Sequence, residues 1–192
     1  MPSAYSLPST PEAQPAIINR IMTEQAAFAN ELERALAGDS AYTPPSHILE
    51  GIGDSLAHAA TPGAPHTIYA ELWHIAFWQQ ITIDWVCGIE TPCPEHASLG
   101  FPSQSDIARE PWPQLLARFF DTNQEASAVA SDTTRLDQLI RCPSPAGQPT
   151  RTMTVREQLE SLAAHNAYHF GRIVLLRQLN GAWPPASGGF TW

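Results

Sequence analysis

The sequence predicts an all-α fold, an up-down four-helix bundle with a short extra helix in the first crossover. The chain has 192 residues and 18 prolines, and the prolines gather in clusters that leave long proline-free windows between them. Because proline breaks helix interiors but suits helix starts and loops, the windows mark helices. Inside them, apolar residues recur at spacings of three and four. No segment shows sustained period-two alternation beside hairpin turns, so we expect no sheet.

Each window carries its own helix signals. The five windows are 16–43, 46–61, 66–91, 114–142 and 150–183. The first follows the start signal Thr10-Pro11-Glu12, and the short second one predicts the extra helix. The apolar stripe of the first window comprises Ile17, Ile18, Ile21, Phe28, Leu32 and Leu36. Leu136, Leu139 and Ile140 extend the fourth window's pattern toward its end at Cys142, so the helix is expected to fill the window. The last window opens with a capping box of Thr154 and Glu157. The predicted stops are Gly38, Gly88 and Gly181.

The charged residues exclude two classes of function. All ten basic residues are arginine and none is lysine, which excludes Schiff-base chemistry, a pyridoxal phosphate anchor and a phosphate-loop lysine. The formal net charge is −9, so the surface should repel phosphate backbones. We therefore do not expect nucleic acid as a partner.

The length and hydrophobic content predict a single domain over residues 1–192, with its core at about 16–185. Neither a signal peptide nor a membrane span is expected, because the N-terminal residues lack a basic and apolar run and no window has eighteen uninterrupted apolar residues. Cys87, Cys93 and Cys142 are odd in number and have no paired C-x-x-C spacing. These features indicate a cytoplasmic protein with free thiols.

His165 and His169 form the most informative pair in the sequence. Residues four apart on a helix lie about 40° apart around its axis, so both imidazoles can reach one metal ion. The same spacing also occurs in surface pairs and in hydrogen-bonded core pairs. The pair shares its face with Gln158, Leu162 and Leu176, which places it on the inward stripe, where two imidazoles without a shared partner would be costly.

A third imidazole comes from the window 66–91. His74 shares a helix face with the core-type residues Ile81 and Trp85. One histidine from this helix and two from another make three neutral nitrogen ligands, a set that suits zinc, nickel or ferrous iron and leaves positions open for water or substrate. The remaining histidines lie in or near the proline-rich connections and are not expected to be ligands: His47, His58, His66 and His96.

Two segments of the chain resemble the DinB-like superfamily of metal-binding four-helix bundles. They are the segment 66–78, which contains Glu71-Leu72-Trp73-His74, and the segment 165–185, which begins His165-Asn166-Ala167-Tyr168-His169 and ends Trp183-Pro184-Pro185. The helix order also agrees, so the resemblance spans about 16–185. It implies that His74, His165 and His169 are the metal ligands and that the protein is a homodimer. It further implies a family that does not bind DNA, includes enzymes that use low-molecular-weight thiols, and has many members without a known reaction.

Three neighbours of the histidines are candidate catalytic residues, each with an alternative role. Arg172 stands where family members often have Gln; it either binds an anionic substrate or forms a salt bridge to a neighbouring helix. Glu71 is a candidate general base, or it orients His74, or it faces water near a helix N-terminus. Tyr168 donates a hydrogen bond to a substrate, or only packs at a helix interface.

Three other residues are considered near the predicted centre: two tryptophans and one cysteine. Trp78 and Trp85 either line an apolar pocket or pack in the core. Cys87 lies about 20 Å along the helix from His74, which makes it a poor fourth ligand. The zinc-protease motif His-Glu-x-x-His is absent because Asn166 follows His165, so peptide hydrolysis is not expected.

Three functions compete on this evidence. The leading hypothesis is a divalent-metal-dependent enzyme that acts on a small molecule, a thiol S-transferase or a hydrolase, since such an ion activates a bound thiol or water near neutral pH. The first alternative is a non-catalytic bundle that binds a metal or ligand for sensing, storage or a stress role. The second is a structural bundle whose histidines are satisfied by hydrogen bonds alone.

Overall fold

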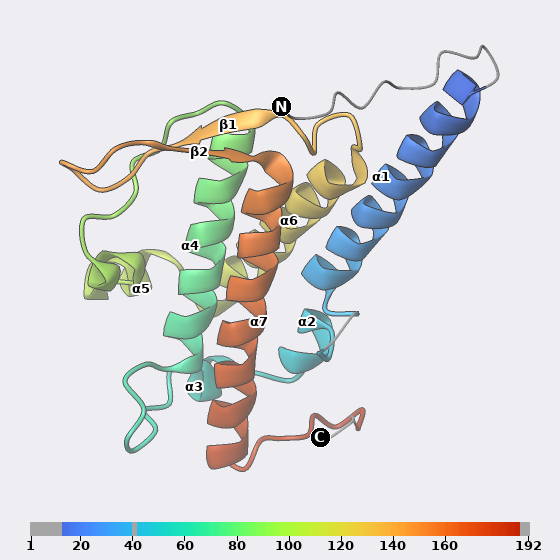
Figure 1. The fold of residues 1–192 in the computed structure, drawn as a ribbon. Coiled ribbons are helices and arrows are strands. Elements are labelled where there is room, and N and C mark those ends of the chain that lie inside the picture. The colour runs from blue at the N-terminus through green and yellow to red at the C-terminus, as the bar shows by residue number, and fades with distance from the viewer. Residues whose placement is uncertain (1–12, 40–41, 189–192) are drawn as a thin grey trace.

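The computed structural model describes residues 13–39 and 42–188 and is mostly helical (Figure 1). This confirms the all-α prediction. The four long helices are α1 (Ala13–Ala37), α4 (Ile68–Val86), α6 (Trp112–Ser131) and α7 (Val155–Leu179). The shorter elements are α2 (Pro45–Ile48), α3 (Asp54–Ala57), the 3₁₀ helix η1 (Ala97–Gly100), α5 (Gln104–Arg109), β1 (Leu139–Cys142) and β2 (Arg151–Thr154).

The ends of the long helices follow the local signals in the sequence. At the start of α7, the Glu157 amide donates to Thr154 Oγ1 at 3.1 Å and the Thr154 amide donates to the Glu157 carboxylate at 2.7 Å. This is the predicted capping box. Gly38 and Gly88 follow α1 and α4 with φ of 79° and 81°, a left-handed conformation that glycine adopts at low cost.

Part of the first predicted helix lies outside the described residues. This applies to the start signal Thr10-Pro11-Glu12 and to the side chains of Ile17, Ile18, Ile21 and Phe28. Leu32 and Leu36, at the other end of the same stripe, are buried in the core.

The prediction of a helix up to Cys142, and of no sheet, is wrong. The helix α6 ends at Ser131, and β1 pairs antiparallel with β2 in a register that places Cys142 opposite Arg151. Each strand has four residues, which is too short for a sustained alternation. Leu136 and Ile140 are four residues apart and both buried, which is the spacing expected of one face of a helix. The helix nevertheless ends at Ser131, and a turn separates it from these two residues.

The connections also differ from the prediction. The window 46–61 forms two single-turn helices, α2 and α3, rather than one helix. Gly51, between them, has a φ of 70°, a left-handed conformation that a continuous helix does not contain. The helices η1 and α5 were not predicted, since they lie among clustered prolines.

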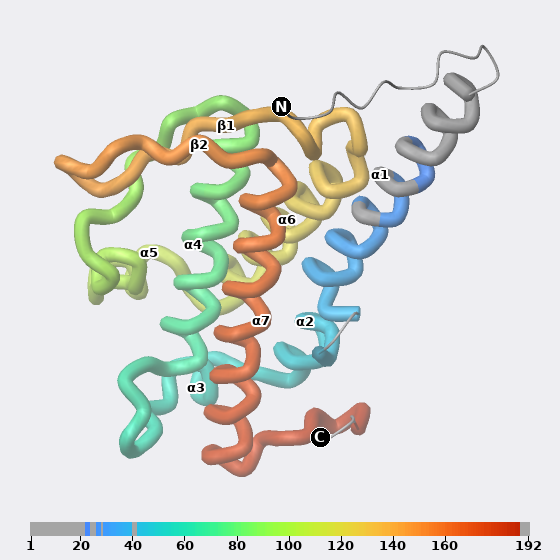
Figure 2. Tube along the Cα trace, viewed as in Figure 1, coloured from blue at the N-terminus to red at the C-terminus, as the bar shows by residue number. Residues whose placement is uncertain are grey.

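The long helices do not simply alternate in direction. Near the start of α4, the Tyr69 hydroxyl donates to the carbonyl of Glu110, just before α6, and further along Gln79 donates to Asn123 of α6. The helices α4 and α6 therefore run parallel, and the connection through η1 and α5 returns the chain to the other end of the bundle (Figure 2). This parallel step departs from the predicted up-down order.

The core consists of two apolar clusters with a polar layer between them. On α4, residues 68–76 belong to one cluster and residues 81–86 to the other; on the antiparallel helix α7, residues 170–176 and 155–163 divide in the same way. The polar groups of the intervening layer project from both helices toward each other. No described helix is long and apolar enough to cross a membrane.

Candidate metal centre

The three predicted histidine ligands meet between α4 and α7. His74 of α4 faces His165 and His169 of α7, and one nitrogen of each lies within 4.8 Å of the others. The Nε2 atoms of His74 and His165 are 3.0 Å apart. His74 and His169 are only 8% and 5% exposed. Among residues 13–39 and 42–188, these three form the one cluster of histidine, cysteine or acidic side chains with the spacing of a metal site.

The spacing of the triad fits a small divalent cation. Imidazole nitrogens about 2.0–2.1 Å from a tetrahedral zinc ion lie about 3.3 Å from each other. The observed 3.0 Å between His74 and His165 is already close to this value. The third nitrogen, within 4.8 Å, needs a shift of about 1.5 Å or less to complete the set.

Hydrogen bonds orient two of the three rings. Nδ1 of His74 donates to the carbonyl oxygen of Gly100 at 2.7 Å, and Nδ1 of His169 donates to the carboxylate of Glu71 at 2.6 Å. A carbonyl oxygen accepts only, so His74 carries its proton on Nδ1 and keeps the lone pair of Nε2 toward the centre. A carboxylate acts in the same way on His169. Metal-binding histidines in proteins typically have such partners.

Glu71 bridges the two helices from a fully buried position. It is 0% exposed, and its second oxygen lies 2.8 Å from Arg172 of α7. The alternative in which Glu71 faces water is therefore wrong. The expectation that it orients a ligand from behind is right in kind, but the ligand is His169 rather than His74. Of the two roles considered for Arg172, the structure contains the salt bridge to a neighbouring helix, which is formed with Glu71 of α4.

A family profile described as the DinB superfamily matches residues 39–173, more than half of the chain. The chain belongs to the DinB superfamily. The matched region contains all three histidines and both partners of the Glu71 carboxylate. No significant match was found among curated proteins or among solved structures.

The loop before α5 supplies a part of the centre that the helical patterns did not indicate. Gly100 contributes its backbone carbonyl, and the ring of Phe101 stacks on His74 with centroids 4.2 Å apart. His66 stacks on the other face of Phe101 at 3.8 Å. His66 lies outside the cluster of three histidines, and the expectation of a solvated loop residue is wrong because its ring packs on Phe101. A backbone carbonyl has no side-chain signal, so only the fold reveals this partner.

Burial keeps two imidazoles of this DinB-superfamily centre neutral, those of His74 and His165. Desolvation lowers the pKa of His74 from 6.5 to about 4. It also lowers the pKa of His165 to about 4, with further lowering by the charges that His169 and His74 would carry. Both rings are therefore neutral at pH 7 and have lone pairs available for a cation.

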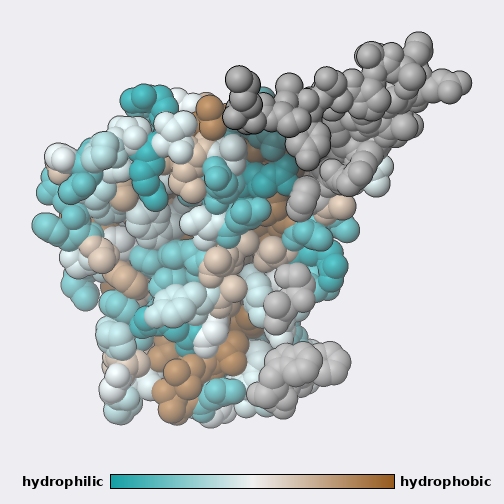
Figure 3. All heavy atoms as spheres, in the orientation of Figure 1, coloured by the Kyte–Doolittle hydropathy of each residue, from teal (hydrophilic) through white to brown (hydrophobic). Residues whose placement is uncertain are grey.

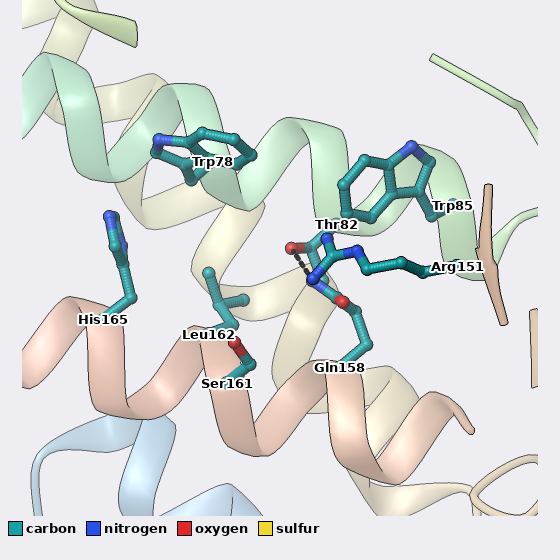
Figure 4. A pocket seen from close by; sticks show the side chains of 8 residues that line it. All are labelled: Trp78, Thr82, Trp85, Arg151, Gln158, Ser161, Leu162 and His165. Atoms are coloured by element: carbon teal, nitrogen blue, oxygen red, sulfur yellow. Dashed lines mark hydrogen bonds between the residues drawn. The ribbon is translucent and has the colours of Figure 1, made fainter. Parts of the chain in front are cut away.

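A cavity of about 190 Å³ adjoins the triad between α4, α7 and β2 (Figure 4). His165 lies at one end of it and Trp78 beside His165. Trp85 is buried in the core and also lines this cavity, so both roles considered for it are present. The complete lining is Trp78, Thr82, Trp85, Arg151, Gln158, Ser161, Leu162 and His165.

A second, larger cavity of about 420 Å³ has Glu71 in its lining. Arg172, Tyr168 and His66 line it together with Glu71. Tyr168 is 62% exposed, and its hydroxyl accepts a hydrogen bond from Arg172 at 3.3 Å. The roles of Arg172 and Tyr168 in binding a substrate stay predictions.

The remaining candidates lie away from the triad. The three cysteines are free, as predicted. Cys87 is exposed at the end of α4, and burial raises the pKa of Cys93 and Cys142. His47, His58 and His96 do not belong to the cluster either.

Replacing Glu71 with Gln should lower metal affinity roughly tenfold or more, because the amide lacks the charge that holds His169 and pairs with Arg172. Competition with a chelating indicator measures the affinity. Glu160→Gln, an exposed position on α7, is the matched control. Equal affinities in the two variants would show that the Glu71 contact does not support the centre.

Gly100→Ala should also weaken metal binding, by roughly tenfold. A Cβ at Gly100 would lie 3.2 Å from two atoms of the His74 ring, which is tight enough that the ring must shift by a few tenths of an ångström. Gly53→Ala is the control, since a Cβ there meets nothing within 4 Å. The same chelator competition checks both, and an unchanged affinity for Gly100→Ala contradicts the predicted displacement.

The metal-free protein should lose stability on mild acidification. The pKa of His74 and His165 is about 4 in the folded chain against 6.5 ordinarily, so the unfolded chain binds more protons between these values. The resulting stability is present above pH 6.5 and is lost as pH falls toward 4. From pH 7 to pH 5 the Tm should fall by roughly 5–10 °C.

The variant His165→Gln removes one of these titrating rings and should show a smaller fall in Tm. His96→Gln, at an exposed position, should behave as the wild type does. A fall of the same size in His165→Gln as in the wild type would contradict the assignment.

Proposed function

We propose that this DinB-superfamily protein is a divalent-metal-dependent enzyme that acts on a small molecule, with transfer of a thiol to an electrophile as the reaction type. The observation that carries the proposal is the meeting of three histidine nitrogens beside a cavity, within 4.8 Å of one another. Three protein ligands leave a position open for a substrate, as in catalytic rather than structural sites.

A bound divalent ion would lower the pKa of a thiol or water at its open position. The chain's own residues prepare that position. His74 and His169 are fixed by Gly100 and Glu71, which maintains their orientation without a substrate. Zinc, nickel and ferrous iron all accept three imidazoles.

Glu71 serves in this proposal as a positioning residue. In this proposal the carboxylate, whose oxygens lie 2.6 Å from His169 and 2.8 Å from Arg172, orients a ligand and does not accept the proton of the substrate. The thiol proton therefore leaves through the cavity to solvent. The thiol sulfur then forms a bond to the electrophilic carbon, and the leaving group departs with the electron pair of the broken bond. Water in place of the thiol would give a hydrolase.

The engaged state of Glu71 also favours one second candidate. A bundle that binds a metal or small ligand for sensing, storage or a stress role needs no general base, and no free carboxylate touches the triad among the described residues. A screen of thiols and electrophiles separates the two, because turnover that disappears in His74→Ala requires an enzyme.

The partners and location follow the same proposal. A low-molecular-weight thiol is the proposed co-substrate, and a homodimer in the cytoplasm the proposed form. Exposed Leu175 and Leu179 on α7 support a self-association surface, and apolar atoms gather over the lower part of the face in Figure 3. The free cysteines support a reducing compartment.

Metal analysis tests the proposal first. The wild type purified without chelators should contain about one divalent ion per chain, and His165→Ala should lose nearly all of it, because two imidazoles bind far more weakly than three. His96→Ala should retain the metal. Elemental analysis measures both, and a wild type without bound metal that also fails to take up zinc, nickel or ferrous iron overturns the proposal.

A further inference from the structure

Among the arginines whose side chains the structure describes, one has no carboxylate or carbonyl partner. Of the nine arginines whose side chains the structure describes, eight contact a carboxylate or a backbone carbonyl: Arg34, Arg109, Arg118, Arg135, Arg141, Arg156, Arg172 and Arg177. For Arg151, no such contact is present within residues 13–39 and 42–188. Since the chain has no lysine, Arg151 is the free side-chain cation of the described region at neutral pH.

Arg151 extends over the cavity that adjoins the triad. It begins β2, and its guanidinium reaches across the cavity toward Thr82 of α4 and Gln158 of α7 (Figure 4). His165 lies at the opposite end of the same cavity. The seven residues from Gln158 to His165 correspond to about 10 Å along the helix. The cavity thus has a cation at one end and a ligand histidine at the other.

The space between these two ends is small and largely apolar. Trp78 and Leu162 line it, and the cavity holds about 190 Å³. The amide of Gln158 is occupied on both sides, since its Nε2 donates to Thr82 at 3.1 Å and its Oε1 accepts from Cys142 at 3.8 Å. No carboxylate lines the cavity. It therefore suits an unbranched apolar body with an anion at one end.

We propose that this cavity binds a slender carboxylic acid, with its carboxylate on Arg151 and its reactive head group beside His165, about 10 Å away. A guanidinium matches a carboxylate through two parallel hydrogen bonds. A net charge of −9 repels anions over the surface in general, so a free arginine selects where an acid can bind. This inference rests on the proposed function and specifies its substrate class.

A series of ω-mercaptocarboxylates of increasing chain length, each compared with the ω-mercaptoalcohol of equal length, tests the inference on the cobalt(II)-loaded protein. Calorimetry gives the affinity for each compound. The wild type should prefer the acid over the alcohol by roughly tenfold at the best length. Arg151→Gln should lose this preference. The control is Arg141→Gln, on the neighbouring strand β1, where the arginine is already paired with Glu90. This variant should keep the preference for the acid.

Equal affinities for acid and alcohol in the wild type, or an undiminished preference in Arg151→Gln, overturn the inference. The near-ultraviolet absorption of the cobalt protein reports separately whether sulfur binds the ion. A preference for the acid without this absorption supports the inference and contradicts the thiol step of the proposed function. The absorption without a preference for the acid contradicts the inference alone.

Discussion

The buried carboxylate of Glu71 is the constraint on which the site depends. An ionised carboxylate that is 0% exposed costs several kcal/mol unless charged and hydrogen-bonded partners surround it. Both of its partners, His169 and Arg172, come from α7. These contacts favour one register of α4 against α7, because a slide by one turn would leave the buried carboxylate unpaired. The same register brings His74 opposite His165.

This constraint explains why the polar layer can exist inside a bundle. The two apolar clusters lie on either side of it along α4 and α7, and burial keeps the rings of His74 and His165 neutral. Neutral imidazoles cost less to bury than charged ones, and a cation compensates them by using their lone pairs. The loop with Gly100 completes the arrangement from outside the helices, and the cavity opens on the side of His165.

The sequence predicted the parts of this arrangement that follow from helical geometry. Proline clusters located the long helices, and the spacing of His165 and His169 placed both rings on one face. The Gly100 carbonyl was beyond reach, because any residue supplies a carbonyl and only the path of the loop places this one against His74. Arg151 was missed for a related reason: its strand has four residues, and its position over the cavity depends on the pairing of β1 with β2. Contacts between distant parts of the chain, rather than a local sequence pattern, determine where the Gly100 carbonyl and the Arg151 side chain lie.

We expect His74, His165 and His169 to hold one divalent cation through their Nε2 atoms. Anomalous diffraction at the absorption edge of the metal found in the purified protein tests this most directly. We expect a single peak about 2.0–2.1 Å from each of the three Nε2 atoms. No peak between α4 and α7, or a peak at the cysteines or the loop histidines instead, would contradict it.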